Sequence, residues 1–276
     1  MLKKYRLLTR SDLDGIVCAS LLREIGLVDE IKFAHPKDMQ DGLIAVTPND
    51  IITNLPGHPD AHMVFDHHAS EAERNKKPDK NLINDPTAPS AAQVVYKHFG
   101  GSVKFPHISK ELMEAADKID SAQLSKEEIL NPQGWVLLGF IMDNRTNLGR
   151  FHNFRISNYQ LMMELVDILR RTRDIDGVLE HPDVAERVVL YREHAELARR
   201  QIKESADIQG KLLVLDFRRE KEIYAINRFA IYALYPNINI SMHILPGKQS
   251  MNTVFAVGKS VLDRSAKIDV GSLMLE

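Results

Sequence analysis

The residues that could do chemistry begin with Asp66, His67 and His68, a carboxylate and two imidazoles in a row at the end of an apolar run. Neighbouring side chains on a strand point to opposite faces, so three consecutive ligands fit better just past a strand end, where a turn can aim them at one ion. In the competing interpretation Asp66 caps the next element and the two histidines lie at the surface. The acidic residues Asp12 and Asp14, upstream in the chain, favour the metal-site interpretation.

Asp12 and Asp14 form a second acidic group, between a predicted buried strand at 4–8 and a predicted helix at 16–25. In an open parallel sheet the loops at the carboxyl ends of the strands form the ligand site, so two acidic loops that each follow a strand can meet there. One aspartate could serve only as a helix cap, but two acids followed by Gly15 exceed what a cap needs. Carboxylates together with imidazole suit a divalent ion such as Mn²⁺ or Mg²⁺.

Composition and charge narrow the class of protein. The chain has 276 residues, enough for two domains, and a net charge of -2 with histidine neutral. It lacks the basic excess of duplex-binding proteins, so we expect no duplex DNA partner and, for any nucleic-acid substrate, a short single strand. We see no signal peptide and no run long enough to cross a bilayer, which predicts a cytoplasmic protein without a membrane partner. The single cysteine, Cys18, excludes an internal disulfide.

The alternation of strand and helix patterns predicts an α/β fold with a doubly wound, mostly parallel sheet. Further strands are expected at 30–34 and 50–54, a loop over the site at 69–89, and helices at 90–99, 110–120, 132–142 and 159–171. The three-four spacing over 182–205 predicts one long helix. After it we expect a strand at 211–216, a helix at 225–235, and strands at 238–245 and 253–257. The predicted division is a catalytic domain at 1–180, a linker helix at 181–209 and a smaller C-terminal α/β domain at 210–276.

Two of these motifs, Asp12-Leu13-Asp14-Gly15 and Asp66-His67-His68, resemble the first and third motifs of the DHH phosphoesterase superfamily. That group includes RecJ-like exonucleases, nanoRNase and pApA phosphodiesterases, family II pyrophosphatases and exopolyphosphatase-like proteins. The overall likeness is greatest to bacterial exopolyphosphatase-related proteins with a DHH-associated C-terminal domain. The resemblance implies a phosphoesterase that uses one or two Mn²⁺ (or Mg²⁺) ions to cleave a phosphodiester or phosphoanhydride bond in a short oligonucleotide, a nucleotide or polyphosphate. A homodimer is compatible with it.

The resemblance also implies the site residues. Asp66, His67 and His68 would be catalytic, and the metal ligands would be Asp12, Asp14, Asn54, Asp66, His67 and Asp120. Asp120 matches the fourth motif best, because Ile119-Asp120-Ser121-Ala122 follows its apolar-Asp-small pattern. Asp117 and Asp143 are secondary candidates for the same ligand. Two positions depart from the family pattern: Asn54 stands where an aspartate usually bridges two metals, and Arg10 stands where many members have histidine.

These departures motivate an alternative function, a phosphate- or nucleotide-binding regulatory protein that kept the fold but lost hydrolysis. Both changes weaken one of the two metal sites of the family, since a neutral amide is a weaker ligand than a bridging carboxylate.

Basic residues elsewhere are candidates for holding the substrate. Arg145 and Arg150 follow a predicted core helix with His152 nearby, and arginine forks match phosphate oxygens, although a structural salt bridge would also account for them. Gly258-Lys259-Ser260 and Arg264 resemble the basic patch of the DHH-associated domain, and residues 269–273 its last helix. The chain ends at Glu276, where that domain's glycine-rich clamp would begin, so the clamp is expected to be either clipped or absent.

Overall fold

The computed structural model describes residues 3–68, 80–247, 251–268 and 270. The chain divides into two compact units. The first contains 1–123, 133–144 and 152–185, and the second contains 124–132, 145–151 and 186–276. Two short segments, 124–132 and 145–151, therefore belong to the second unit although the chain returns to the first unit after each of them. The sequence-based division at 180 and 209 stays a prediction about folding domains.

The first unit is built on a five-stranded sheet in the order β2-β1-β3-β4-β5, and every described pair of neighbouring strands is parallel. The predicted α/β fold with a mostly parallel sheet is thus confirmed. The strands are β1 (Tyr5–Arg10), β2 (Val28–Ala34), β3 (Asp50–Thr53), β4 (Met63–Asp66) and β5 (Leu82–Asn84). The prediction of a continuous loop at 69–89 is wrong at residues 82–84, which form strand β5. This edge strand has only three residues, all of intermediate burial, so its sequence shows no alternation of apolar and polar residues.

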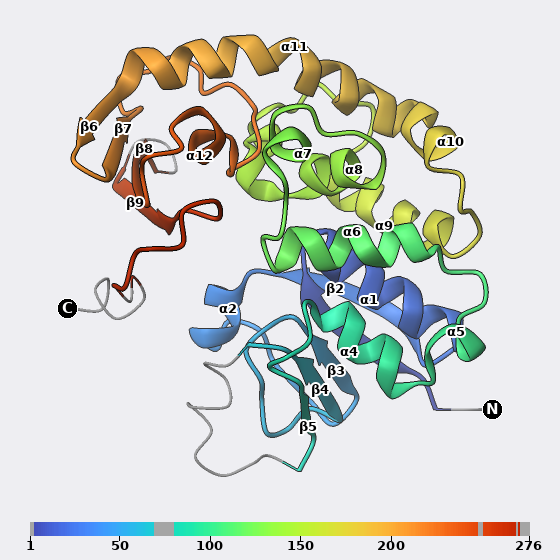
Figure 1. Ribbon diagram of the computed structural model, residues 1–276. Coiled ribbons are helices and arrows are strands. Elements are labelled where there is room, and N and C mark those ends of the chain that lie inside the picture. Colours follow the sequence, from blue (N-terminus) through green and yellow to red (C-terminus); the bar gives the residue numbers. More distant parts are fainter. Residues whose placement is uncertain (1–2, 69–79, 248–250, 269, 271–276) are drawn as a thin grey trace. The chain divides into compact units, whose positions relative to one another are not determined.

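Both faces of this sheet are covered. On one face α1 (Leu13–Glu24) contacts β1 and β2 and is flanked by α4 (Ala91–His98), α6 (Lys110–Asp120) and α9 (Asn158–Leu169), as Figure 1 shows. On the other face Leu8, Ile52 and Val64 form a buried cluster with residues from α2 (Pro36–Gln40) and the loop after it. Because both faces are buried, the sequences of these strands are continuous runs of apolar residues.

Helix α8 (Gly134–Met142) packs closely against neighbouring helices at Gly139. A Cβ at Gly139 would lie 2.3 Å from Ile119 Cδ1 and 3.0 Å from Leu13 Cδ2. The backbone of α8 therefore approaches α6 one residue before Asp120 and α1 one residue before Asp14. Shorter helices of the first unit are α5 (Gly101–Lys104) and α10 (Ile175–Glu180).

Helix α11 (Pro182–Ser205) has the predicted bounds and leads directly into β6 (Ala206–Gln209), a strand that the sequence does not predict. The sheet of the second unit has the order β6-β7-β8-β9, with β7 (Leu212–Asp216) parallel to β8 (Ile240–Pro246) and both outer pairs antiparallel. The other elements of this unit are α7 (Lys126–Leu130), η1 (Asn144–Thr146, which begins in the first unit), η2 (Leu148–Arg150), α12 (Ala230–Leu234) and β9 (Thr253–Lys259).

The helix predicted at 225–235 is wrong in its first half, because α12 covers only Ala230–Leu234. The backbone N–H of Ala225 donates to His194 Nδ1 at 3.1 Å, and the Asn227 side chain donates to the carbonyl of Ile129 at 2.8 Å. Tertiary partners thus hold these residues in place of a helical turn. The helix expected at 269–273 lies outside the described residues, apart from residue 270.

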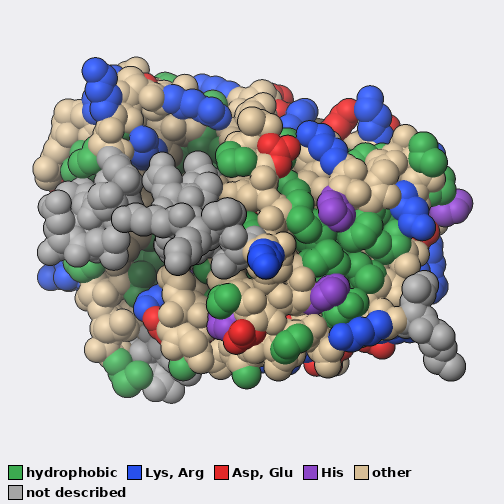
Figure 2. Space-filling model, turned by 90° about the horizontal axis from the view of Figure 1, so that it is seen from below, with side chains coloured by type: hydrophobic (Ala, Val, Ile, Leu, Met, Phe, Trp, Pro, Cys, Tyr) green, Lys and Arg blue, Asp and Glu red, His purple; other side chains and the backbone are tan. Residues whose placement is uncertain are grey.

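Among the described residues, no helix combines the length and the apolar character needed to cross a bilayer. On the face drawn in Figure 2, the described Lys and Arg side chains are dispersed among acidic, polar and apolar ones and form no continuous basic stripe.

Candidate metal centre

The carboxyl ends of three neighbouring strands carry the predicted ligands. Asp12 lies two residues after β1, Asn54 follows β3 directly, and Asp66 is the last residue of β4. The strand order changes direction between β1 and β3, which is where open α/β sheets bind their ligands. The Asn54 amide nitrogen lies 3.4 Å from Asp12 Oδ1, so the loops after β1 and β3 are in contact.

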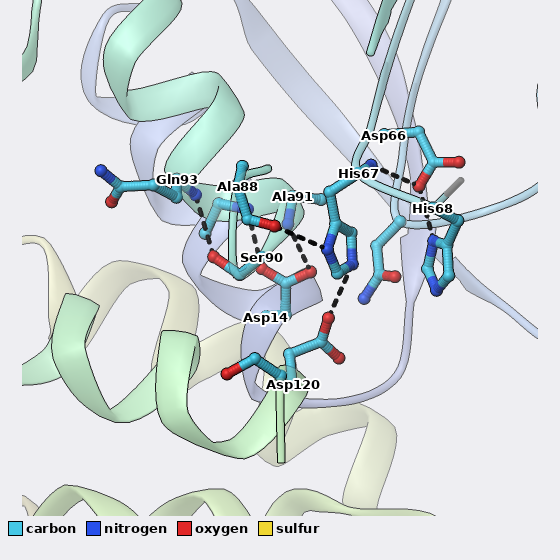
Figure 3. Close-up of polar contacts among 12 residues, drawn as sticks. Asp14, Asp66, His67, His68, Ala88, Ser90, Ala91, Gln93 and Asp120 are labelled. Carbon is cyan, nitrogen blue, oxygen red and sulfur yellow. Dashed lines mark hydrogen bonds and ion pairs between the residues drawn. The ribbon is translucent and has the colours of Figure 1, made fainter. Parts of the chain in front are cut away.

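Asp14 lies in the first turn of α1 and is buried. Its carboxylate accepts hydrogen bonds from the backbone N–H groups of Ala91 at 3.2 Å and Ala92 at 2.7 Å, at the N-terminus of α4 (Figure 3). Burial raises the pKa of Asp14 well above its usual range, and the negative charges of Asp120 and Asp12 add to this rise. Without a cation, Asp14 is therefore a carboxylate whose charge is poorly compensated.

His67 is held from both sides of its ring (Figure 3). Nδ1 lies 3.3 Å from the carbonyl oxygen of Ala88, and Nε2 lies 2.7 Å from Asp120 Oδ2. Burial works to lower the pKa of His67, but the hydrogen bond to Asp120 and the charges of Asp120, Asp14 and Asp66 together raise it to about 9. The carbonyl favours a proton on Nδ1, which leaves Nε2 as the nitrogen that faces the acids.

Two overlapping groups of side chains could hold a metal ion here. Asp14, His67 and Asp120 form one, and Asp66, His67 and His68 form the other; in each group the ligand atoms lie within 4.8 Å of one another. Asp66 Oδ1 accepts the backbone N–H of His67 at 2.8 Å and lies 2.7 Å from His68 Nδ1. Its second oxygen, Oδ2, is buried without a hydrogen-bond partner among the described residues.

The residues present fit a divalent cation. Asp66 Oδ2 and Asn54 Oδ1 are both buried acceptors that no described donor satisfies. Buried polar atoms in proteins are almost always bonded, and a cation would satisfy acceptors that lack an N–H or O–H. The surrounding donors are carboxylate oxygens and one imidazole nitrogen, a set typical of divalent metal sites.

Asp12 differs from the other acids of the site. It is the N-cap of α1, with Oδ1 accepting the backbone N–H of Gly15 at 3.1 Å, so the capping role considered for one aspartate belongs to this residue. Its Oδ2 lies 3.1 Å from Arg10 Nε. Asn54, which contacts the same carboxylate, has a left-handed backbone with φ of 52°.

Gly15 permits this tight start of α1. A Cβ at this position would lie 1.9 Å from the carbonyl oxygen of Arg10 and 2.9 Å from Thr9 Oγ1. The first turn of the helix therefore lies directly over the end of β1, which brings both acidic residues to the edge of the sheet.

The secondary candidates lie outside the two groups. Asp117 accepts a 2.6 Å hydrogen bond from Ser90 Oγ, and burial is the main cause that raises its pKa. Asp143 is the buried residue that follows α8, and it belongs to none of the potential metal groups among the described residues. The structure thus brings Asp120 to His67 in preference to both.

The sequence did not indicate the backbone groups that position the ligands. The carbonyl of Ala88 holds His67, and the first N–H groups of α4 hold Asp14. Ser90, which caps α4 by accepting the N–H of Gln93 at 3.0 Å, could have been recognised from its place before a helical pattern.

The predicted substrate-binding residues lie in both units. His152 is an exposed residue of the first unit, whereas Arg145, Arg150, Lys259 and Arg264 belong to the second. Arg150 Nε donates to Asn147 Oδ1 at 3.3 Å, and Arg264 Nε donates to the carbonyl of Val261 at 3.3 Å. Lys259 is the exposed last residue of β9. Their role in binding substrate stays a prediction.

Fold and site together define a doubly wound α/β protein with a candidate metal centre at the carboxyl edge of its parallel sheet. Among solved structures, the pGpG-specific phosphodiesterase PggH from Vibrio cholerae is 53% identical to this chain, with a TM-score of 0.83, and the match covers 99% of this chain and 88% of that one. The chain therefore belongs to the family of that phosphodiesterase.

A second match, an uncharacterized protein from Helicobacter pylori G27, has 12% identity and a TM-score of 0.34, too low to carry an argument. No protein-family model and no curated protein matches the chain.

Proposed function

We propose that this protein is a divalent-metal-dependent phosphodiesterase that cleaves short oligonucleotides, with pGpG as the first substrate to test. The observation that carries the proposal is the convergence of Asp14, His67 and Asp120, whose ligand atoms lie within 4.8 Å of one another beside Asp66. The substrate follows from the 53% identity to a pGpG-specific phosphodiesterase over 99% of the chain. The wider DHH assignment rests on the two sequence motifs.

Asp14, Asp66, His67 and Asp120 would hold the cation, and Mn²⁺ is our first choice because it accepts both carboxylate and imidazole ligands. When bound, such an ion lowers the pKa of a water molecule and neutralises phosphate oxygens. The contribution of the chain is positioning. The Ala88 carbonyl orients the His67 ring, as hydrogen-bond partners of ligating histidines commonly do, and the N-terminus of α4 holds Asp14.

His68 is the residue we assign to proton transfer. Its side chain is 45% exposed, and its Nδ1 lies 2.7 Å from Asp66 Oδ1. Asp66 thus orients the ring and leaves Nε2 as the nitrogen that can exchange a proton with the substrate or the leaving oxygen.

The test is a turnover assay with Mn²⁺ on three substrates: pGpG, GTP and polyphosphate. We expect pGpG to be cleaved fastest, because the related phosphodiesterase carries that specificity in its name. Asp66→Asn is the matched control, since it keeps the side-chain shape and removes the charge. If none of the three substrates is turned over above this control, the proposal is wrong.

The second candidate function, binding without hydrolysis, is favoured by one observation. Arg10 and Asn54 both approach the Asp12 carboxylate, at 3.1 Å and 3.4 Å, and so weaken it as a metal ligand. A binding protein would be thermally stabilised by pGpG and Mn²⁺ without forming product. Measurable turnover would exclude this function.

A further inference from the structure

The environment of Asp12 sets it apart from the other acids at this edge of the sheet. Its Oδ1 accepts the N–H of Gly15 at 3.1 Å and the Asn54 amide at 3.4 Å, and its Oδ2 forms an ion pair with Arg10 Nε at 3.1 Å. Among the described residues, no Lys or Arg forms an ion pair with Asp14, Asp66 or Asp120. Asp12 is therefore the acid that pairs with a guanidinium, whereas Asp66 and Asp120 face imidazoles and Asp14 faces backbone N–H groups.

Arg10 supplies that guanidinium and has binding capacity left over. A guanidinium carries five N–H donors in a planar fork, and the ion pair with Asp12 uses its Nε side. Within the part of the chain that the structure describes, its two terminal amino groups form no hydrogen bond. The side chain is 27% exposed, whereas the side chain of Asp12 is 9% exposed. Arg10 is thus anchored on a buried carboxylate while remaining accessible to a ligand.

The position of Arg10 directs this charge to the candidate centre. It is the last residue of β1, beside the point where the strand order changes direction. A fixed cation and a metal-binding acidic group therefore lie at the same edge of the sheet.

We propose that Arg10, held by Asp12, binds the phosphate of the substrate and takes the place of a second metal ion, so that the centre formed by Asp14, Asp66, His67 and Asp120 binds one divalent cation per chain. This inference rests on the proposed function for the identity of the substrate. The arginine fork matches two phosphate oxygens, and its charge is permanent at any physiological pH. Asn54 is consistent with the same arrangement, because its amide donates to Asp12 where a carboxylate would repel it.

The first experiment counts metal ions. Titration of the full-length apoprotein with Mn²⁺ by calorimetry should give one site per chain, and the double variant Arg10→His/Asn54→Asp should give two. These substitutions replace the guanidinium with an imidazole and add a carboxylate beside Asp12, so they supply the ligands that a second ion needs. Two ions in the unsubstituted protein would overturn the proposal.

The second experiment measures phosphate binding in the presence of saturating Mn²⁺, with inorganic phosphate and pGpG as probes. Arg10→Gln should weaken the binding of either probe about tenfold or more, as expected for the loss of charge-assisted hydrogen bonds, and Arg10→Lys should weaken it less. Mn²⁺ should bind to Arg10→Gln at least as tightly as to the unsubstituted protein, because a neighbouring positive charge is removed. Unchanged phosphate binding by Arg10→Gln would overturn the proposal.

A third variant separates binding from mere neutralisation of Asp12. Asparagine is also a good N-cap, so Asp12→Asn keeps the start of α1 and removes the charge that Arg10 compensates. If Arg10 serves only to neutralise Asp12, Arg10→Gln/Asp12→Asn should regain phosphate affinity. We expect it to remain as weak as Arg10→Gln. The metal and phosphate titrations do not require turnover. An inactive protein would therefore refute the proposed hydrolysis, and the two titrations would still decide the role of Arg10.

Discussion

The two ends of the parallel sheet in the first unit differ in how buried charge is compensated. At the amino ends Arg6 pairs in register with Asp50, and its Nε and Nη2 lie 2.6 Å and 2.9 Å from the two carboxylate oxygens. Asp50 also accepts the backbone N–H of Thr47 at 2.7 Å and its hydroxyl at 3.0 Å. Burial alone would raise the pKa of Asp50, but Arg6 and Thr47 outweigh it and lower the pKa.

At the carboxyl ends the acids outnumber the cations that could pair with them. Asp14 has a strongly raised pKa because it is buried near Asp120 and Asp12, and Asp66 Oδ2 has no hydrogen-bond partner among the described residues. The parallel sheet therefore has a satisfied ion pair at the amino ends of its strands and uncompensated negative charge near the carboxyl ends. The ion pair at the first end stabilises the fold, whereas the acids at the second end form a site that could hold a cation.

Asp14→Asn should have the largest effect on function. It removes a buried negative charge from the centre, so we expect turnover with Mn²⁺ to fall by more than about 100-fold. The apoprotein should be as stable as the unsubstituted one or more so, because asparagine carries no charge to desolvate. Thermal melting with and without Mn²⁺ measures both parts. If Mn²⁺ raises the Tm of Asp14→Asn as much as that of the unsubstituted protein, Asp14 is not a ligand.

Asp50→Asn should show the reverse pattern. The substitution leaves Arg6 without its carboxylate, and we expect a loss of about 2 to 4 kcal/mol in the free energy of unfolding, at or below the range for fully buried pairs because the Arg6 side chain is 26% exposed. The folded protein should keep its turnover, since this end of the sheet is remote from the ligands. Urea unfolding and an assay at saturating Mn²⁺ check the two expectations. If Asp50→Asn is stable but inactive, Asp50 contributes to function and not to stability, contrary to the expectation for this end of the sheet.

The pH dependence of stability provides a further test of the role of Asp50. The pKa of Asp50 is lowered in the folded protein, so its contribution is present above the unfolded value of about 3.9 and is lost as the pH falls through the folded value. Between pH 6 and pH 3, Asp50→Asn should therefore lose less unfolding free energy than the unsubstituted protein. Parallel urea titrations across this range give the difference, and two curves of equal slope would contradict it.

Asp117→Asn should have the smallest effect. Asparagine can still accept the hydrogen bond from Ser90 Oγ, and Asp117 belongs to neither metal group. We expect turnover within about fivefold of the unsubstituted protein and an unchanged stoichiometry of Mn²⁺. A loss as large as that of Asp14→Asn would mean that Asp117, which the sequence offered as an alternative to Asp120, takes part in the centre.

Much of the fold could be predicted because it follows from strong periodic patterns. The parallel sheet, α6 at Lys110–Asp120 and α11 at Pro182–Ser205 were predicted with little or no error in their bounds. The errors fall where tertiary contacts decide: β5 has three residues, β6 follows α11 without a break, and His194 and Ile129 hold the segment before α12.

The site was predictable at the level of residue types but not of their neighbours. Strand ends and spacing brought Asp12, Asp14 and Asp66 to one edge, and the motif resemblance added Asp120. The sequence could not reveal that the carbonyl of Ala88 orients His67, because every residue has a carbonyl. Nor could it show that Arg10 reaches Asp12, because that contact depends on the tight turn over Gly15.

The left-handed backbone of Asn54, with φ of 52°, restricts what this position can become during evolution. Glycine, asparagine and aspartate adopt that conformation most readily, whereas branched or bulky residues would strain the turn. The exchange between asparagine and aspartate needs only one nucleotide substitution. Descendants of this sequence can therefore change the charge beside Asp12 without rebuilding the loop.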